Sequence, residues 1–150
     1  MANGRAHRRI GAVAGAALAF AMSKGQPIWH RIIEIIGGAA AGLLVALLPD
    51  WFEPANSPYH RKFFHGLLFN AAIIGFFARK ICPCQSSLRA RADYEATLRK
   101  QTQTTGSIIW HFLLETSSRF LAGAAAGAIA GYGSHLVLDA FTPRSMPLIA

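Results

Sequence analysis

Most apolar residues of this chain are gathered into four long runs, which short polar or proline-containing segments separate. The runs cover residues 10–22, 28–48, 63–78 and 107–141, and the last could break at residues 116–118. Strands rarely exceed about eight residues, so runs of this length indicate helices. The second and fourth runs reach the roughly 20 apolar residues that cross a bilayer core. We therefore predict an all-α, membrane-associated bundle of about four helices, forming a single domain over residues 1–150.

The basic charge of the chain favours an anionic partner. The formal net charge is +8, although only 15% of the residues are charged, against about 25% in ordinary soluble domains. Residues 79–106 hold six basic and two acidic residues. They are predicted to be an amphipathic segment or loop that contacts anionic lipid headgroups, or a plain soluble connector, with Cys82 and Cys84 as free thiols in it. Nucleic acid is the other anionic candidate, but the apolar runs favour lipid.

Glycines recur at intervals of four residues in three of the apolar runs. They form the sets Gly11/Gly15, Gly38/Gly42 and Gly123/Gly127/Gly131. On a helix this spacing makes a flat face that allows the backbone of another helix to approach closely. We expect tightly packed helices, and the same small-residue faces are a candidate surface for a homo-oligomer.

Side chains that bind metal ions are concentrated in two places. Four of them fall within residues 50–65, and two more, at positions 135 and 139, lie on one face of a helix. If consecutive helices run antiparallel, both groups and a histidine ahead of the first helix lie at the same end of the bundle. Imidazole and carboxylate together suit zinc or manganese. The predicted ligands are His7, Asp50, Glu53, His60, His65, His135 and Asp139.

Two further histidine–glutamate pairs have a spacing of four residues. They are His30 with Glu34 and His111 with Glu115, and the antiparallel arrangement places both at the opposite end of the bundle. Residues four apart on a helix can interact directly. We expect two buried structural ion pairs at this end rather than a second metal site.

Three stretches of the chain resemble the YdjM family. They are residues 47–50 (LLPD), 60–65 (HRKFFH) and 131–143 (GYGSHLVLDAFTP). The resemblance covers most of the chain. It implies a LexA-regulated protein of the bacterial inner membrane, multi-pass or deeply embedded, with metal-dependent hydrolase activity. It further implies a distant similarity to zinc-dependent phospholipase C and P1 nuclease, in which a helical bundle holds a cluster of zinc ions.

The resemblance also implies roles for particular residues. By it, Asp50, His60, His65, His135 and Asp139 are metal ligands, and His7 matches a histidine that the family often has near its start. One departure concerns residues 49–53, which read PDWFE where the family commonly has PDIDH. Glu53 therefore stands as a candidate replacement for a ligand.

A phosphoester of a phospholipid or related lipid is the expected substrate. Two or three divalent ions, zinc or alternatively manganese, would bind the phosphate and activate a water molecule. Asp50 would take the proton of that water, and the guanidinium of Arg61 would pair with the phosphate. Two other functions remain open. One is a P1-type metal-dependent nuclease, and the other is a non-enzymatic membrane protein in which the metal cluster is structural.

Overall fold

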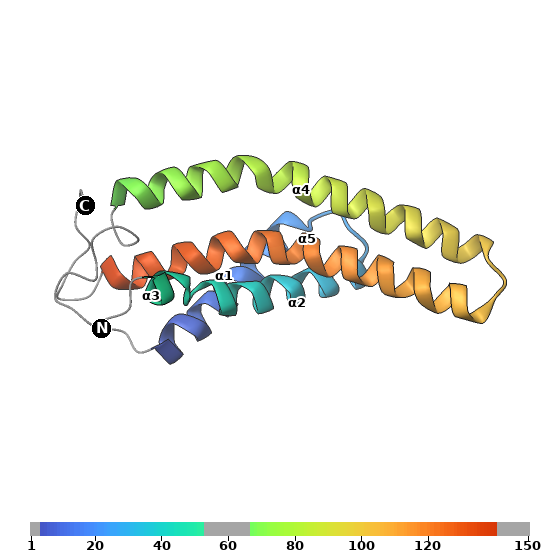
Figure 1. The fold of residues 1–150 in the computed structure, drawn as a ribbon, viewed down its shortest axis with the longest axis horizontal. Coiled ribbons are helices and arrows are strands. Elements are labelled where there is room, and N and C mark those ends of the chain that lie inside the picture. Colours follow the sequence, from blue (N-terminus) through green and yellow to red (C-terminus); the bar gives the residue numbers. More distant parts are fainter. Residues whose placement is uncertain (1–3, 53–66, 141–150) are drawn as a thin grey trace.

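The structure is a computed structural model, and it describes residues 4–52 and 67–140. Within these residues it contains helices and no strands. The helices are α1 (Gly4–Met22), α2 (Ile28–Val45), α3 (Leu48–Phe52), α4 (Leu67–Gln101) and α5 (Thr105–Ala140). Four long helices and one short one form the bundle shown in Figure 1. The predicted all-α bundle is confirmed.

Three helices make a compact group, and the fourth long helix packs along one of them. α1, α2 and α5 contact one another, whereas α4 packs mainly against α5. Each helix turns back on the preceding long one, so the start of α1, the short α3, the start of α4 and the end of α5 lie together at one end (Figure 1). The antiparallel arrangement that the sequence analysis assumed is therefore the observed one.

Glycine contacts fix how closely α1, α2 and α5 approach. At one level Gly15 of α1 and Gly127 of α5 both face Gly38 of α2. A Cβ atom built on either residue would clash with the carbonyl oxygen of Gly38, so only glycine permits this approach. One turn along, Gly11 of α1 and Gly131 of α5 both face Gly42 of α2, and a Cβ atom on either would clash with its carbonyl oxygen.

These contacts confirm the tight packing that the glycine spacing predicted. They also show where the small-residue faces are used, because each is covered by another helix of the same chain. A homo-oligomer stays a prediction, and it would have to form through other surfaces.

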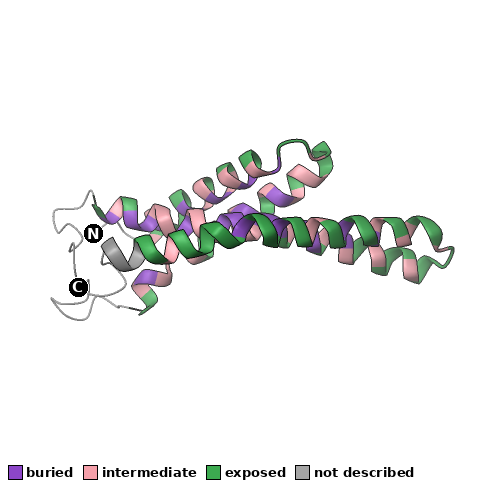
Figure 2. Cartoon of the chain, turned by 90° about the horizontal axis from the view of Figure 1, so that it is seen from above, coloured by how far each residue is buried: buried purple, intermediate pink, exposed green. Residues whose placement is uncertain are grey.

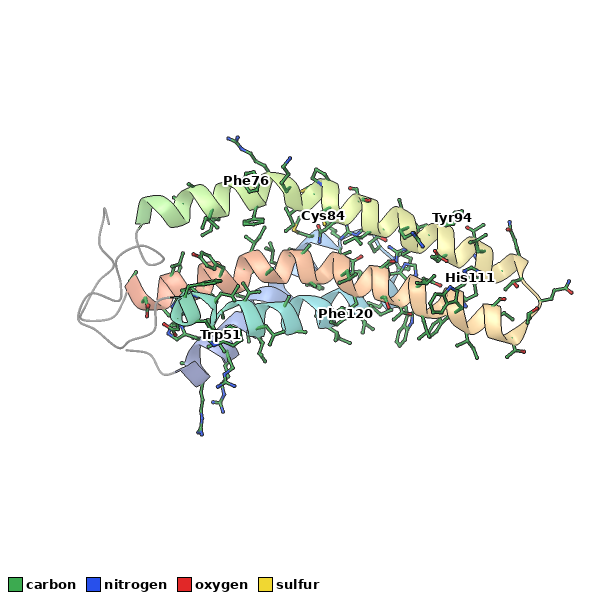
Figure 3. The ribbon with its side chains drawn as sticks, viewed as in Figure 1. Trp51, Phe76, Cys84, Tyr94, His111 and Phe120 are labelled. Atoms are coloured by element: carbon green, nitrogen blue, oxygen red, sulfur yellow. The ribbon has the colours of Figure 1, made fainter. Side chains whose placement is uncertain are left out.

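Of the two forms predicted for residues 79–106, an amphipathic segment or a loop, the loop is wrong, because most of these residues are helical. α4 continues without interruption from Leu67 to Gln101, with Pro83 inside it. The helix persists because its inward-facing charged residues are held by neighbouring helices; Arg91 and Glu95 also pair within α4 across one turn. Cys82 and Cys84 are free thiols, as predicted, but both lie exposed on this helix rather than in a loop; Figure 3 shows Cys84. The predicted break at residues 116–118 is likewise absent, since α5 is continuous there.

α4 and α5 extend beyond the rest of the bundle as an antiparallel hairpin. Figure 2 shows that buried residues gather on the inner faces where the helices pack together, and that the tip of the hairpin is largely exposed. His111 lies in this hairpin (Figure 3), with its Nδ1 atom 2.7 Å from Oε2 of Glu95. This hydrogen bond is the main cause that lowers the pKa of the Glu95 carboxyl below its ordinary value.

Buried ion pairs join the helices at the end opposite α3. Glu34 is fully buried, and its carboxylate accepts hydrogen bonds from Nε and Nη2 of Arg89 at 3.0 and 2.6 Å. Arg119, which is 1% exposed, donates to Oε1 of Gln26 at 2.9 Å and to the carboxylate of Asp93. Such paired and hydrogen-bonded charges tolerate burial that a lone charge would not.

The predicted pairs His30–Glu34 and His111–Glu115 are wrong, because each histidine has a different partner. His30 lies 3.5 Å from Glu115, and His111 pairs with Glu95, so both pairs connect different helices. Residues four apart lie on the same face of a helix, and here that face packs against another helix. Each histidine therefore meets a glutamate of the neighbouring helix instead of the one on its own helix. The expectation of structural ion pairs at this end is confirmed.

Two helical segments are long and apolar enough to cross a membrane. They are Ile28–Phe52 and Thr105–Ala140. These are the runs that the sequence analysis singled out as long enough to span. The first run and the apolar part of α4 do not meet the same standard among the described residues.

We predict that Gly127→Ala destabilises the protein by about 1–3 kcal/mol, because the added methyl group overpacks the contact with Gly38. The matched control is Gly75→Ala, where the methyl group meets open space on a helix and helix propensity improves by about 0.5–1 kcal/mol. Thermal unfolding in detergent measures both. Equal melting temperatures for the two variants would contradict the assignment of Gly127 as a packing contact.

Candidate metal centre

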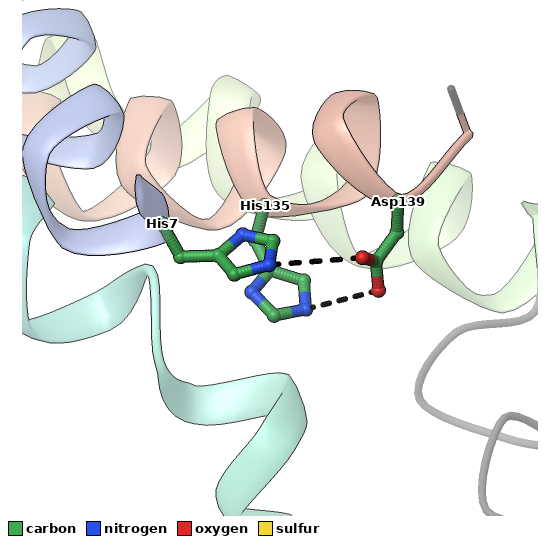
Figure 4. A group of neighbouring side chains, drawn as sticks. All are labelled: His7, His135 and Asp139. Atoms are coloured by element: carbon green, nitrogen blue, oxygen red, sulfur yellow. Dashed lines mark ion pairs between the residues drawn. The ribbon is translucent and has the colours of Figure 1, made fainter. Parts of the chain in front are cut away.

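Two histidines and an aspartate come together at the end of the bundle where α1 starts and α5 ends (Figure 4). His7 lies on the first turn of α1, and His135 and Asp139 lie one turn apart near the end of α5. All three are at most 2% exposed. One potential ligand atom from each lies within 4.8 Å of the others. Their burial is dictated by the glycine packing, which draws α1 and α5 together at this level.

The distances between these side chains are uniform. Nε2 of His135 lies 3.4 Å from Oδ2 of Asp139, and Nε2 of His7 lies 3.7 Å from Oδ1 of the same carboxylate. The two imidazole rings stack with their centroids 4.0 Å apart. Both nitrogens therefore point at a single carboxylate, as the dashed lines of Figure 4 indicate.

A backbone carbonyl orients His135. Its Nδ1 atom lies 2.6 Å from the carbonyl oxygen of Ala46, the C-cap residue of α2. A carbonyl oxygen only accepts hydrogen bonds, so Nδ1 donates, and in a neutral ring Nε2 then carries a lone pair. Metal-binding histidines usually donate their other ring N–H to a carbonyl or carboxylate in this way.

Asp50 stands at the more open side of the group. It lies on α3, and its Oδ1 is 3.6 Å from Nε2 of His135. Pro49 is buried in the first turn of α3, where a missing N–H is tolerated. The side chain of Asp50 is 35% exposed, against 3% for that of Asp139. The group is thus closed on the side of α1 and α5 and more accessible on the side of α3.

These separations are compatible with a divalent cation between the side chains. Direct N–H···O contacts measure about 2.7–3.2 Å, whereas the three nitrogen–oxygen distances here run from 3.4 to 3.7 Å. Two ligand atoms about 2.0–2.1 Å from a tetrahedral zinc ion are about 3.3–3.4 Å apart. Nε2 of His135 faces the carboxylates of both Asp50 and Asp139, and imidazole and carboxylate together suit a divalent cation.

The structure brings together four of the seven predicted ligands: His7, Asp50, His135 and Asp139. Their assignment as metal ligands stays a prediction. Glu53, His60 and His65, and the predicted phosphate-binding Arg61, lie outside the described residues. Sequence reasoning missed the carbonyl of Ala46, because a backbone oxygen leaves no mark on the residue type.

Comparison with known proteins identifies a family for the whole chain. The family described as YdjM inner membrane protein matches residues 1–150. No curated protein and no solved structure matches the chain. The further similarity to phospholipase C and P1 nuclease stays a prediction.

We predict that the purified protein retains a divalent metal ion and that the double variant His135→Ala/Asp139→Ala loses most of it, because two of the buried donors are removed. Metal analysis by mass spectrometry after extensive dialysis measures this. The control is His111→Ala, which removes a histidine that pairs with Glu95 far from the site and should leave the metal content unchanged. A double variant with a full complement of metal would refute the assignment.

Proposed function

The chain belongs to the YdjM family of inner membrane proteins, and on that premise we propose that it is a membrane-bound, metal-dependent hydrolase that cleaves a phosphoester of a phospholipid or related lipid. The observation that carries the proposal is the buried group of His7, His135 and Asp139 with the more exposed Asp50 at its edge. Metal centres that perform catalysis commonly have three protein ligands and one accessible position.

The described residues supply donors for one ion. His7, His135 and Asp139 would hold it on the buried side, and Asp50 would complete the site or act beside it. A bound divalent ion would supply Lewis acidity, which polarises a phosphate and favours the deprotonation of water. A second or third ion would need the predicted ligands between residues 53 and 65. Zinc suits the imidazole-rich donor set best, with manganese as the alternative.

The residues of the chain would handle the proton. In the cleavage of a phosphodiester, the oxygen of water forms a bond to phosphorus while the bond from phosphorus to the lipid alcohol breaks. Asp50, with its partly exposed carboxylate, would accept the proton of the water and return it to the departing alcohol oxygen. His135 would stay fixed throughout, because Ala46 holds its ring.

A nuclease is the second candidate, and one observation favours it. Trp51 and Phe52 follow Asp50 directly and are 68% and 60% exposed. Exposed aromatic rings next to a phosphate-cleaving site can stack on the bases of single-stranded nucleic acid. Aromatic residues are equally typical of the membrane interface, which is the interpretation that agrees with the family.

We predict that Asp50→Asn lowers kcat for phospholipid cleavage by about 10²–10⁴-fold, the usual loss when a general base is removed. Phospholipid vesicles and single-stranded DNA are offered separately, and the released phosphate groups are measured. The control is Tyr94→Phe, which removes one polar atom from an exposed residue of α4 distant from the site. Cleavage of DNA alone would replace the lipid substrate by nucleic acid. A metal-loaded protein that cleaves neither would leave a structural role for the site.

We predict that the protein stays in the membrane fraction after a wash with concentrated salt and is released by detergent. Salt screens the attraction between basic residues and headgroups, but it does not weaken the burial of the apolar segments Ile28–Phe52 and Thr105–Ala140. Sedimentation followed by immunoblotting distinguishes the outcomes. Release by salt alone would show a peripheral protein and contradict membrane-spanning helices.

A further inference from the structure

An apolar groove runs between α4 and the rest of the bundle. Its volume is about 540 Å³, within the range of about 300–1,000 Å³ that is usual for small-molecule sites. The lining residues are nearly all apolar and come from three sides, with Leu48 and Phe52 on α3, Ile74 and Phe77 on α4, and Ala128 and Tyr132 on α5. The groove exists because α4 packs mainly on α5 and leaves the side of α2 and α3 uncovered.

One end of the groove lies beside the candidate metal centre. Leu48 and Phe52 line the groove from one face of the short α3, and Asp50, between them in the sequence, lies on the other face of this helix. On α5, Tyr132 lines the groove three residues before His135, which places the two about one turn apart. This end of the groove is therefore within about one helical turn of His135, and a molecule that occupies it would end beside α3 and the metal centre.

The other end of the groove lies farther along α4. Ile74 of α4 lies near Gly133 of α5, close to the first end. Cys84, ten residues later on α4, lines the other end together with Ala125 of α5. The distance along α5 from Tyr132 to Ala125 is about 10 Å at the usual helical rise. Lys80 is the charged residue of the lining, and its aliphatic stem can cover apolar surface while the ammonium reaches water.

We propose that this groove binds one acyl chain of the phospholipid whose phosphoester is cleaved at the metal centre, with the headgroup at Asp50 and the end of the chain near Cys84. This inference rests on the proposed function for the identity of the headgroup. The acyl chain itself is argued from the apolar lining, the elongated shape and the membrane in which the family resides. A hydrocarbon chain has no polar atoms, so such a lining leaves none of its groups unsatisfied.

The two exposed cysteines provide a probe and its control. Cys84 lines the far end of the groove, whereas Cys82 lies two residues away on the same helix and is not part of the lining. The variant Cys82→Ser keeps the probe alone, and Cys84→Ser keeps the control alone. Each is purified in a sterol-based detergent without straight alkyl chains, and the rate of maleimide modification is followed by mass spectrometry.

Dipalmitoyl phosphatidylglycerol at ten times its dissociation constant, offered in the Asp50→Asn background so that the lipid stays intact, should slow modification of Cys84 about tenfold, because about a tenth of the sites remain empty. It should leave Cys82 unaffected. Dibutanoyl phosphatidylglycerol has the same headgroup but a chain too short to reach Cys84, so it should protect neither cysteine. Equal rates with and without the long-chain lipid would overturn the proposal. So would a Cys84 that is already unreactive without lipid, since the protein itself would then fill the groove.

A groove-filling variant separates this inference from the proposed function. Ala128→Phe should abolish the protection of Cys84 and the cleavage of long-chain lipid, while metal content and cleavage of a water-soluble phosphodiester persist. The matched control is Ala17→Phe on the exposed face of α1, which should change none of these. Unchanged protection in Ala128→Phe would overturn the groove. Protection of Cys84 in a wild-type protein that cleaves neither substrate would support the groove and refute the hydrolase.

Discussion

Backbone contact between α1, α2 and α5 holds the centre of the bundle together and sets how its helices align. Glycines remove the side chains that normally separate helices, so carbonyl oxygens of α2 lie where a Cβ atom of α1 or α5 would be. The contact also sets the register. Ala46 and His135 are 89 residues apart, and the same offset relates Gly38 to Gly127 and the glycine pair one turn along. A slip of α5 against α2 would therefore move His135 away from the carbonyl that orients it.

The two ends of the bundle treat buried charge differently. At the end opposite α3, carboxylates meet guanidinium groups, as Glu34 meets Arg89 at hydrogen-bonding distance. At the other end, Asp50 and Asp139 meet imidazoles at distances too long for a direct hydrogen bond. The first arrangement makes structural contacts between helices. The second gathers residues that could hold a metal ion, and this donor set supports a functional role for the end that holds His135.

Periodic patterns in the sequence predicted much of this structure. The spacing of the glycines predicted the close helix contacts, and the antiparallel assumption predicted that His7, Asp50, His135 and Asp139 would meet. Properties that depend on which helices are neighbours could not be predicted. The composition of residues 79–106 indicated a polar surface, but their helical form depends on partners such as Glu34. The partners of His30 and His111 likewise depend on the register of the packed helices, which no local pattern contains.

The buried side chains of Glu34 and Arg119, whose Oε1 and Nη1 atoms lie 4.0 Å apart, also bear on how the two apolar segments pack. Glu34 is fully buried and Arg119 is 1% exposed, and each lies in a segment that can span a bilayer. An arginine at the centre of a helix inserted alone costs about 2.5–3.5 kcal/mol. In the folded bundle the two charges face each other across the contact between α2 and α5, which offsets part of that cost. Packing of the two segments against each other therefore favours the burial of both charges.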